Sequence, residues 1–77
     1  MNNTEDNLSF ALFATDPRVV AYAGTVAKSE GHALITISLY KRLWEEATTL
    51  HHPAYYMRLE AWERAIAVGL VLEHPDL

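Results

Sequence analysis

The feature that most constrains this chain is its short length combined with the complete absence of cysteine. A domain of 77 residues buries only roughly 60% of the surface that its unfolded chain exposes, so its folded state is marginally stable. Small domains usually gain stability from disulfides, a bound metal or a partner. Without cysteine, disulfides, thiolate metal sites and a cysteine nucleophile are excluded. The chain therefore relies on tight helix packing or on a partner.

Charge and hydropathy argue against two classes of partner. Six Lys and Arg residues against ten Asp and Glu residues give a net charge of -4, and the basic residues are scattered, so we expect no nucleic-acid interface. The longest apolar runs cover a few residues, far fewer than the roughly 20 that span a bilayer. The start MNNTEDNLSF lacks the basic region and apolar core of a secretory signal. We therefore expect a soluble, cytoplasmic protein with no membrane association.

The chain divides into a polar N-terminal tail and one helical domain. The first seven residues, MNNTEDN, are polar and acidic with little to bury, and such a segment is mobile by default. We therefore expect a mobile tail over residues 1–15, from which Phe10, Leu12 and Phe13 dock against the rest of the protein. Residues 16–77 form the helical domain.

A first helix is predicted over DPRVVAYAGTVAKSEG. Asp16 is a favourable N-cap residue, and Pro17 suits the first helical position because the N–H that it lacks would have no helical partner there. The helix closes near Gly31. Its apolar face, spaced by three and four residues, comprises Val19, Tyr22, Ala23, Val26 and Ala27.

The next segment, ALITISLY, is ambiguous. Its apolar residues alternate with Thr36 and Ser38, which is typical of a short strand, but the apolar residues that follow continue at helical spacing. A lone strand without a pairing mate would be unstable. We therefore predict a helix over residues 37–50, capped by Thr36 or Ser38. The helical spacing joins Leu39, Leu43, Ala47 and Leu50, with Tyr40 and Trp44.

The third segment has the strongest helical period. Charged residues fall away from its apolar face, and Glu60 and Arg64 have the favourable i, i+4 spacing. We predict a helix over residues 54–72, ended by His74 and Pro75. Its apolar face comprises Tyr55, Leu59, Trp62, Ile66 and Leu70. The predicted fold is all-α, a small bundle of about three helices with a mobile N-terminal tail.

The adjacent His51 and His52 raise the question of a metal or catalytic centre. Neighbouring residues face different sides of a helix, and neither histidine has a second ligand at i+4. Pro53 instead fits the first position of the third helix, so HHP is interpreted as the start of that helix. The serines lie in no nucleophile-elbow or triad context. We expect no metal site in this chain and no hydrolase that works alone.

Aromatic residues are concentrated on the last two predicted helices. They could fill a small helical core, but two or three thin helices cannot enclose all of them. We therefore expect some of the rings to face a partner, because aromatic residues are over-represented in interface cores. The residues concerned are Tyr40, Trp44, Tyr55, Tyr56 and Trp62.

The order of the segments AYAGTVAKSEG, TISLYKRLWEEA and YYMRLEAWERAIAVGLVLE resembles the helical N-terminal half of nitrile hydratase beta subunits. Related activator proteins and thiocyanate hydrolase chains share the pattern. The resemblance covers residues 16–73. A standard beta subunit continues into a β-barrel half, whereas this chain stops at Leu77. The resemblance therefore implies a split beta subunit, as in toyocamycin nitrile hydratase, or a short activator.

The family's chemistry is the hydration of a nitrile to an amide by low-spin cobalt or iron. A Cys-x-x-Cys-Ser-Cys claw in the alpha subunit holds that metal, and this chain, without cysteine, cannot. The resemblance therefore implies no cofactor bound here, and a role in closing the active-site cleft of a metal-bearing alpha subunit. A second beta-like chain would carry the barrel half.

The resemblance also implies site residues. In the family, an arginine of the second helix hydrogen-bonds the oxidised claw, where a guanidinium satisfies several anionic oxygens; Lys41 and Arg42 are the candidates for this catalytic contact. The substrate pocket would be lined by Ile37, Tyr40, Tyr55 and Leu59. Leu59 stands where the family usually has tryptophan, which would widen the pocket for a bulky nitrile.

Three functions remain open. The first is a metal-free, beta-like subunit of a nitrile hydratase-type enzyme. The second is an activator that escorts the alpha subunit and then leaves, which the same helical pattern would serve. The third is an unrelated small helical adaptor or inhibitor, for which the acidic tail and exposed aromatic residues would suffice.

Overall fold

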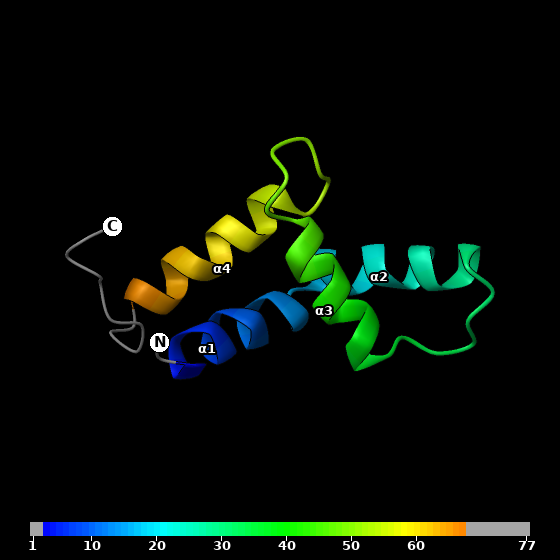
Figure 1. Ribbon diagram of the computed structural model, residues 1–77, viewed down its shortest axis with the longest axis horizontal. Coiled ribbons are helices and arrows are strands. Elements are labelled where there is room, and N and C mark those ends of the chain that lie inside the picture. The colour runs from blue at the N-terminus through cyan, green and yellow to red at the C-terminus, as the bar shows by residue number, and fades with distance from the viewer. Residues whose placement is uncertain (1–2, 68–77) are drawn as a thin grey trace.

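The computed structural model describes the backbone of residues 3–67 and the side chains of residues 7–67. Within that part of the chain there are four α-helices and no strand, so the predicted all-α class is confirmed (Figure 1). None of these helices combines the length and the apolar character that a membrane span requires. The helices are α1 (Asn3–Ala14), α2 (Pro17–Ser29), α3 (Ile37–Glu46) and α4 (Tyr55–Ala67).

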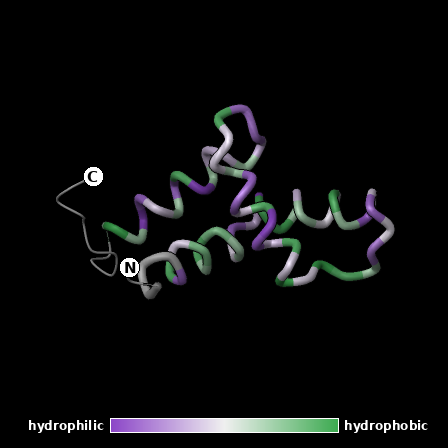
Figure 2. Tube along the Cα trace, viewed as in Figure 1, coloured by the Kyte–Doolittle hydropathy of each residue, from purple (hydrophilic) through white to green (hydrophobic). Residues whose placement is uncertain are grey.

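Helix α1 corrects the prediction of an N-terminal tail. Residues 3–14 are helical, and the side chains of Ser9 and Phe13 are fully buried. The most extensive helix–helix contact in the described structure is between α1 and α4, which run side by side in Figure 1. Figure 2 shows the hydrophobic second half of α1. The polar start of the segment hid a helix because α1 depends on packing against α4, more than 40 residues away in the sequence.

Helix α2 begins and ends close to the predicted residues. The Asp16 side chain accepts a hydrogen bond from the backbone N–H two residues ahead, and Pro17 occupies the first helical position. At the other end, Gly31 has a φ of +80°, which suits a residue without a Cβ. The His32 N–H donates to the Ala27 carbonyl at 2.8 Å, the bond that closes a Schellman motif.

Helix α3 settles the ambiguity of the middle segment. Of the two predicted caps, the structure uses Thr36, whose hydroxyl accepts a hydrogen bond from the Leu39 N–H at 3.2 Å. The helix ends at Glu46 and not at residue 50. Beyond it, the Thr48 hydroxyl donates to the Glu45 carbonyl at 2.8 Å, a local bond that competes with a helical one. Leu50 is consequently 57% exposed in the α3–α4 connection and contributes little to the core.

Trp44 joins three of the helices. Its ring meets Phe10 and Phe13 of α1 edge to face, with centroids 6.0 and 5.1 Å apart. The Arg58 guanidinium of α4 lies 3.9 Å from the Trp44 ring centroid and also donates a hydrogen bond to the Trp44 carbonyl. That carbonyl is in the last turn of α3, where no helical donor reaches it. The core around it consists of Phe13, Val19, Ala23, Ala27, Leu39, Leu43, Ala47, Ala54 and Ala61.

The predicted end of the third helix lies outside the described residues. The structure describes α4 as far as Ala67, so the expected extension to residue 72, and the roles of Leu70, His74 and Pro75, stay predictions.

Candidate functional site

Helix α4 has two apolar faces that differ in residue size. On the inner face, Ala61 and Ala65 are fully buried, as is Ala54 just before the helix. The large apolar residues of the predicted apolar face lie on another side: Leu59 is 41% exposed, and its helical neighbours are half-buried. We call this second face the outer stripe; its members are Tyr55, Leu59, Trp62 and Ile66. The stripe has the predicted helical spacing, and the structure leaves its side chains partly exposed.

Close packing against α1 accounts for this arrangement. Ala61 of α4 and Phe13 of α1 belong to the same core cluster, and Ser9 of α1 is also fully buried. Small side chains on α4 let the backbones of the two helices approach, whereas tyrosine or tryptophan there would push them apart. The larger residues therefore remain on the side of α4 that α1 does not cover.

A shallow hollow of about 210 Å³ lies beside the outer stripe. Its volume is below the roughly 300 to 1,000 Å³ of a typical small-molecule site, so it fits one or two side chains of a partner better than an enclosed substrate. Tyr55 is flanked by Tyr56, whose ring meets it edge to face at 5.0 Å and which is 65% exposed. The hollow is lined by Ala47, Thr48, Tyr55, Arg58, Leu59 and Trp62.

The predicted pocket residues are only partly brought together. Tyr55 and Leu59 line the hollow described above. Tyr40 is half-buried against the core cluster, and Ile37 is 62% exposed at the first position of α3; neither contributes to the lining of that hollow. Within this chain alone, the four residues therefore form no single pocket.

The two predicted basic residues have different surroundings. An Arg42 Nη2 donates to a Glu30 carboxylate oxygen at 2.7 Å, and the Arg42 Nε lies 3.8 Å from Glu46. The hydrogen bond to Glu30 raises the pKa of Arg42. Arg42 thus ties α3 to the end of α2. Lys41 is exposed, lines a surface hollow together with Trp44, and forms no ion pair within residues 7–67, so it is the more accessible of the two to a partner.

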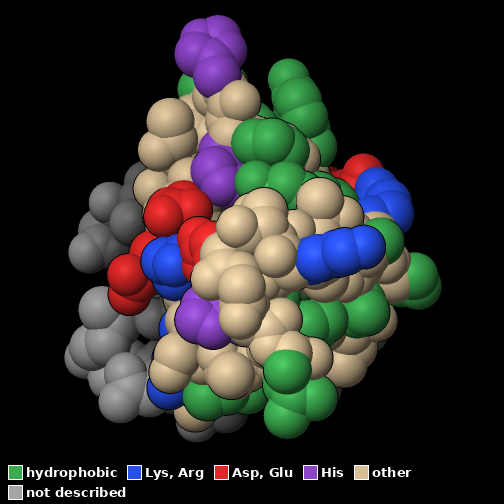
Figure 3. Space-filling model, turned by 90° about the vertical axis from the view of Figure 1, so that its right-hand side faces the viewer, with side chains coloured by type: hydrophobic (Ala, Val, Ile, Leu, Met, Phe, Trp, Pro, Cys, Tyr) green, Lys and Arg blue, Asp and Glu red, His purple; other side chains and the backbone are tan. Residues whose placement is uncertain are grey.

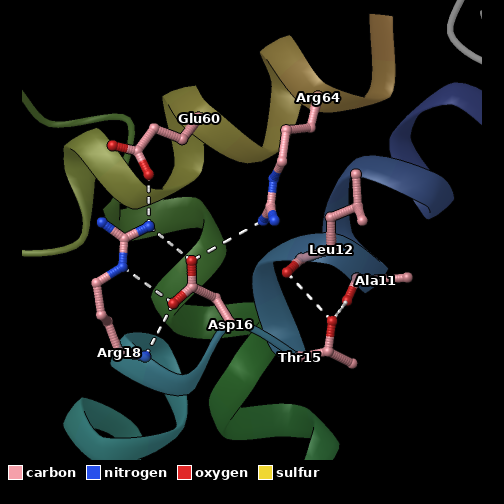
Figure 4. Close-up of polar contacts among 7 residues, drawn as sticks. All are labelled: Ala11, Leu12, Thr15, Asp16, Arg18, Glu60 and Arg64. Atoms are coloured by element: carbon pink, nitrogen blue, oxygen red, sulfur yellow. Dashed lines mark hydrogen bonds and ion pairs between the residues drawn. The ribbon is translucent and has the colours of Figure 1, made fainter. Parts of the chain in front are cut away.

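A charge network, which sequence reasoning missed, orients α4. The Arg18 guanidinium donates to both carboxylate oxygens of Asp16, at 3.1 and 2.7 Å, and also pairs with Glu60 of α4 (Figure 4). Arg64 approaches the same Asp16 carboxylate at 3.9 Å. The hydrogen bonds from Arg18 lower the pKa of Asp16 from 3.8 to about 2, although burial opposes the shift.

The network changes two predictions. Asp16 was expected only to cap α2, but it also joins the start of that helix to α4. Glu60 and Arg64 were expected to pair with each other, and each instead pairs across to the start of α2. Their i, i+4 spacing is compatible with either choice, and the nearby Asp16–Arg18 pair decides it. Ion pairs thereby join the charged side of α4 to the start of α2, on a different side of α4 from the outer stripe.

The histidine pair forms no metal centre with other described residues. No group of three metal-ligating side chains occurs within residues 7–67. HHP does mark the start of a helix, but α4 begins at Tyr55 and Pro53 lies in the preceding turn. Pro53 therefore does not occupy the first helical position as predicted, and the His52 Nδ1 accepts a hydrogen bond from the Ala54 N–H at 3.0 Å.

Comparisons of the chain with protein-family models, with curated proteins and with solved structures found no match.

Proposed function

We propose that this chain is a metal-free helical subunit of a nitrile hydratase-type complex, and that it binds the metal-bearing subunit through the outer stripe of α4. The enzyme class rests on the motif resemblance. One observation carries the binding role: α4 buries its small residues and presents its large apolar residues outward. The chain would not be catalytic on its own, and the complex would act in the cytoplasm.

The energetics of the outer stripe favour a partner. Burial of a large apolar side chain contributes about 1.5 to 3 kcal/mol, and a small domain gains little if such residues stay in water. Tyrosine and tryptophan are also the residues that most often dominate interface energies. The hollow beside Leu59 and Trp62 would accept one or two side chains of the partner, and Tyr56 would extend the contact area.

Two of the proposed site residues already share a surface. Tyr55 and Leu59 would line the nitrile pocket once the metal-bearing subunit covers the hollow. Lys41, which is exposed, is better placed than Arg42 to reach the oxidised cysteine claw, because Arg42 is paired with Glu30. Ile37, exposed on the same helix as Lys41, would complete the pocket only through the partner's surface, and Tyr40 would support it from the core side.

Recovery of the complex tests the proposal. We would purify the tagged chain from its source cell and determine the native mass and metal content of whatever accompanies it. The expected complex contains a Cys-x-x-Cys-Ser-Cys chain, cobalt or iron at near-stoichiometric amounts, and a second beta-like chain with the barrel half. A well-folded chain recovered without any cysteine-claw protein would overturn the proposal.

Two matched variants locate the contact. Leu59→Asp places a charge in the outer stripe and is expected to abolish recovery of the metal-bearing chain. Leu34→Asp makes the same change at another exposed leucine, in the α2–α3 connection, and should leave recovery unchanged. Loss in both variants, or in neither, would contradict binding through α4. A complex that keeps this chain after metal loading identifies a permanent subunit, whereas release at that stage identifies an activator.

A further inference from the structure

His52 satisfies the backbone at the start of α4. Its side chain is only 14% exposed, its Nδ1 accepts a hydrogen bond from the Ala54 N–H at 3.0 Å, and its carbonyl accepts one from the Tyr55 N–H at 3.0 Å. The first N–H groups of a helix have no acceptor within the helix itself. The imidazole therefore accepts the N–H of the residue that precedes α4 from two positions earlier, as an aspartate or asparagine side chain does in an Asx turn.

This geometry determines where the imidazole carries its proton. A ring nitrogen that accepts a hydrogen bond has no proton of its own, so neutral His52 is protonated at Nε2. That nitrogen lies 3.5 Å from a Glu46 carboxylate oxygen of α3. Tyr22 of α2 meets the imidazole edge to face, with centroids 5.9 Å apart. Within residues 7–67, Glu46 and Tyr22 are the titratable groups that face His52. The other carboxylate oxygen of Glu46 pairs with Arg42.

We propose that His52 is a proton-sensitive cap of α4. Addition of a proton from solvent places a hydrogen on Nδ1, which turns the acceptor of the Ala54 N–H into a donor and breaks that bond. The imidazolium is then attracted more strongly to Glu46, so the ring stays in place while the Ala54 N–H, just before α4, loses its acceptor. Acidification thus weakens the attachment of Ala54 at the start of α4.

The position of the cap connects it to the outer stripe. Tyr55, the first residue of that stripe, donates a hydrogen bond from its N–H to the His52 carbonyl, which belongs to the α3–α4 connection. On the end of the molecule that faces the viewer in Figure 3, the topmost histidine side chain projects outward, and those below it lie beside acidic and basic side chains. The proposal concerns this chain alone and holds or fails whatever partner the outer stripe binds.

Nuclear magnetic resonance of the full chain tests the proposal. At about pH 8 the ¹⁵N shifts of His52 should show an unprotonated Nδ1 and a protonated Nε2. On acidification to about pH 5, the protection of the Ala54 amide against hydrogen exchange, corrected for the intrinsic pH effect and referred to the buried Leu43, should fall about fivefold. A neutral ring protonated at Nδ1, or a protection ratio that stays constant, would overturn the proposal.

Two substitutions separate the cap from a general effect of pH. His52→Asn supplies a side-chain oxygen that accepts the same N–H at every pH, so the Ala54 amide should be equally protected under both conditions. His51→Asn alters the exposed neighbour, for which the structure shows no cap bond, and should retain the pH dependence of the unmodified chain. A persistent pH dependence in His52→Asn would assign the effect to another group.

Discussion

The two apolar faces of α4 reverse the usual relation between side-chain size and burial. Ala61 and Ala65 are fully buried on the inner face, whereas Leu59 is 41% exposed on the outer stripe and Trp62 is half-buried there. Alanine and large apolar residues are both often buried in proteins, so the unusual feature is the exposure of the larger ones. The difference teaches that α4 makes a close contact with α1 on one side and leaves its larger side chains partly exposed on another, where we propose that a partner binds.

Ala61→Leu should disrupt the packing of the inner face and have the largest effect on the free energy of unfolding. A leucine would force α1 and α4 apart, and overpacking of this kind costs about 1 to 3 kcal/mol. We expect a decrease at the upper end of that range in the free energy of unfolding, measured with urea. Ala67→Leu adds the same volume at an exposed position of α4 and should change stability by less than about 0.5 kcal/mol. Equal effects of the two substitutions would show that the inner face is not tightly packed.

Removal of the Asp16 charge should have the second largest effect on stability, because it removes the ion pairs that Asp16 forms with Arg18 and with Arg64 of α4. The pKa of Asp16 is about 2 in the folded protein against 3.8 for an unperturbed carboxyl, so its ionised form stabilises the fold. The contribution, on the order of 2 kcal/mol, is fully present above about pH 4 and is lost as pH falls through about 2. Unfolding curves of the unmodified chain and of Asp16→Asn should differ by this amount at neutral pH and converge in acid.

Ser9→Ala should stabilise the packing of α1 against the inner face of α4. The Ser9 hydroxyl is fully buried and has no hydrogen-bond partner among the described residues. Replacement by alanine removes an unsatisfied polar group and favours the helix, for a gain of about 1 kcal/mol in the free energy of unfolding. Ser29→Ala, at an exposed serine that donates to the Val26 carbonyl, is the control and should give no gain. A loss of stability in Ser9→Ala would indicate a bond to the hydroxyl.

Tyr56→Ser should have the smallest effect on the isolated chain. Its side chain is 65% exposed next to the outer stripe, so thermal unfolding should show a change within about 0.5 kcal/mol. The same variant should weaken recovery of the partner, because aromatic residues of this kind contribute strongly to interfaces. Stability and binding that fall together would place Tyr56 in the fold and not at an interface.

Local sequence signals located most of the helices. Asp16 with Pro17, Thr36 and Gly31 are capping residues that act within one turn of backbone, and each performs in the structure a role predicted for it. Reasoning of this kind failed where distant residues decide. Helix α1 depends on α4, and Asp16 finds Arg64 only after folding. The His52 cap was also missed, since histidine is not among the residues usually considered as N-caps.

The sequence by itself determined that α4 is a helix with a stripe of large apolar residues at regular spacing. It could not determine which side of α4 is buried, because Ala54, Ala61 and Ala65 also recur at helical spacing. Hydrophobicity favours the aromatic side, whereas the volume available between α1 and α4 favours alanine. Only the tertiary structure resolves that competition, because packing depends on the shape of the neighbouring helix and not on the period of one helix.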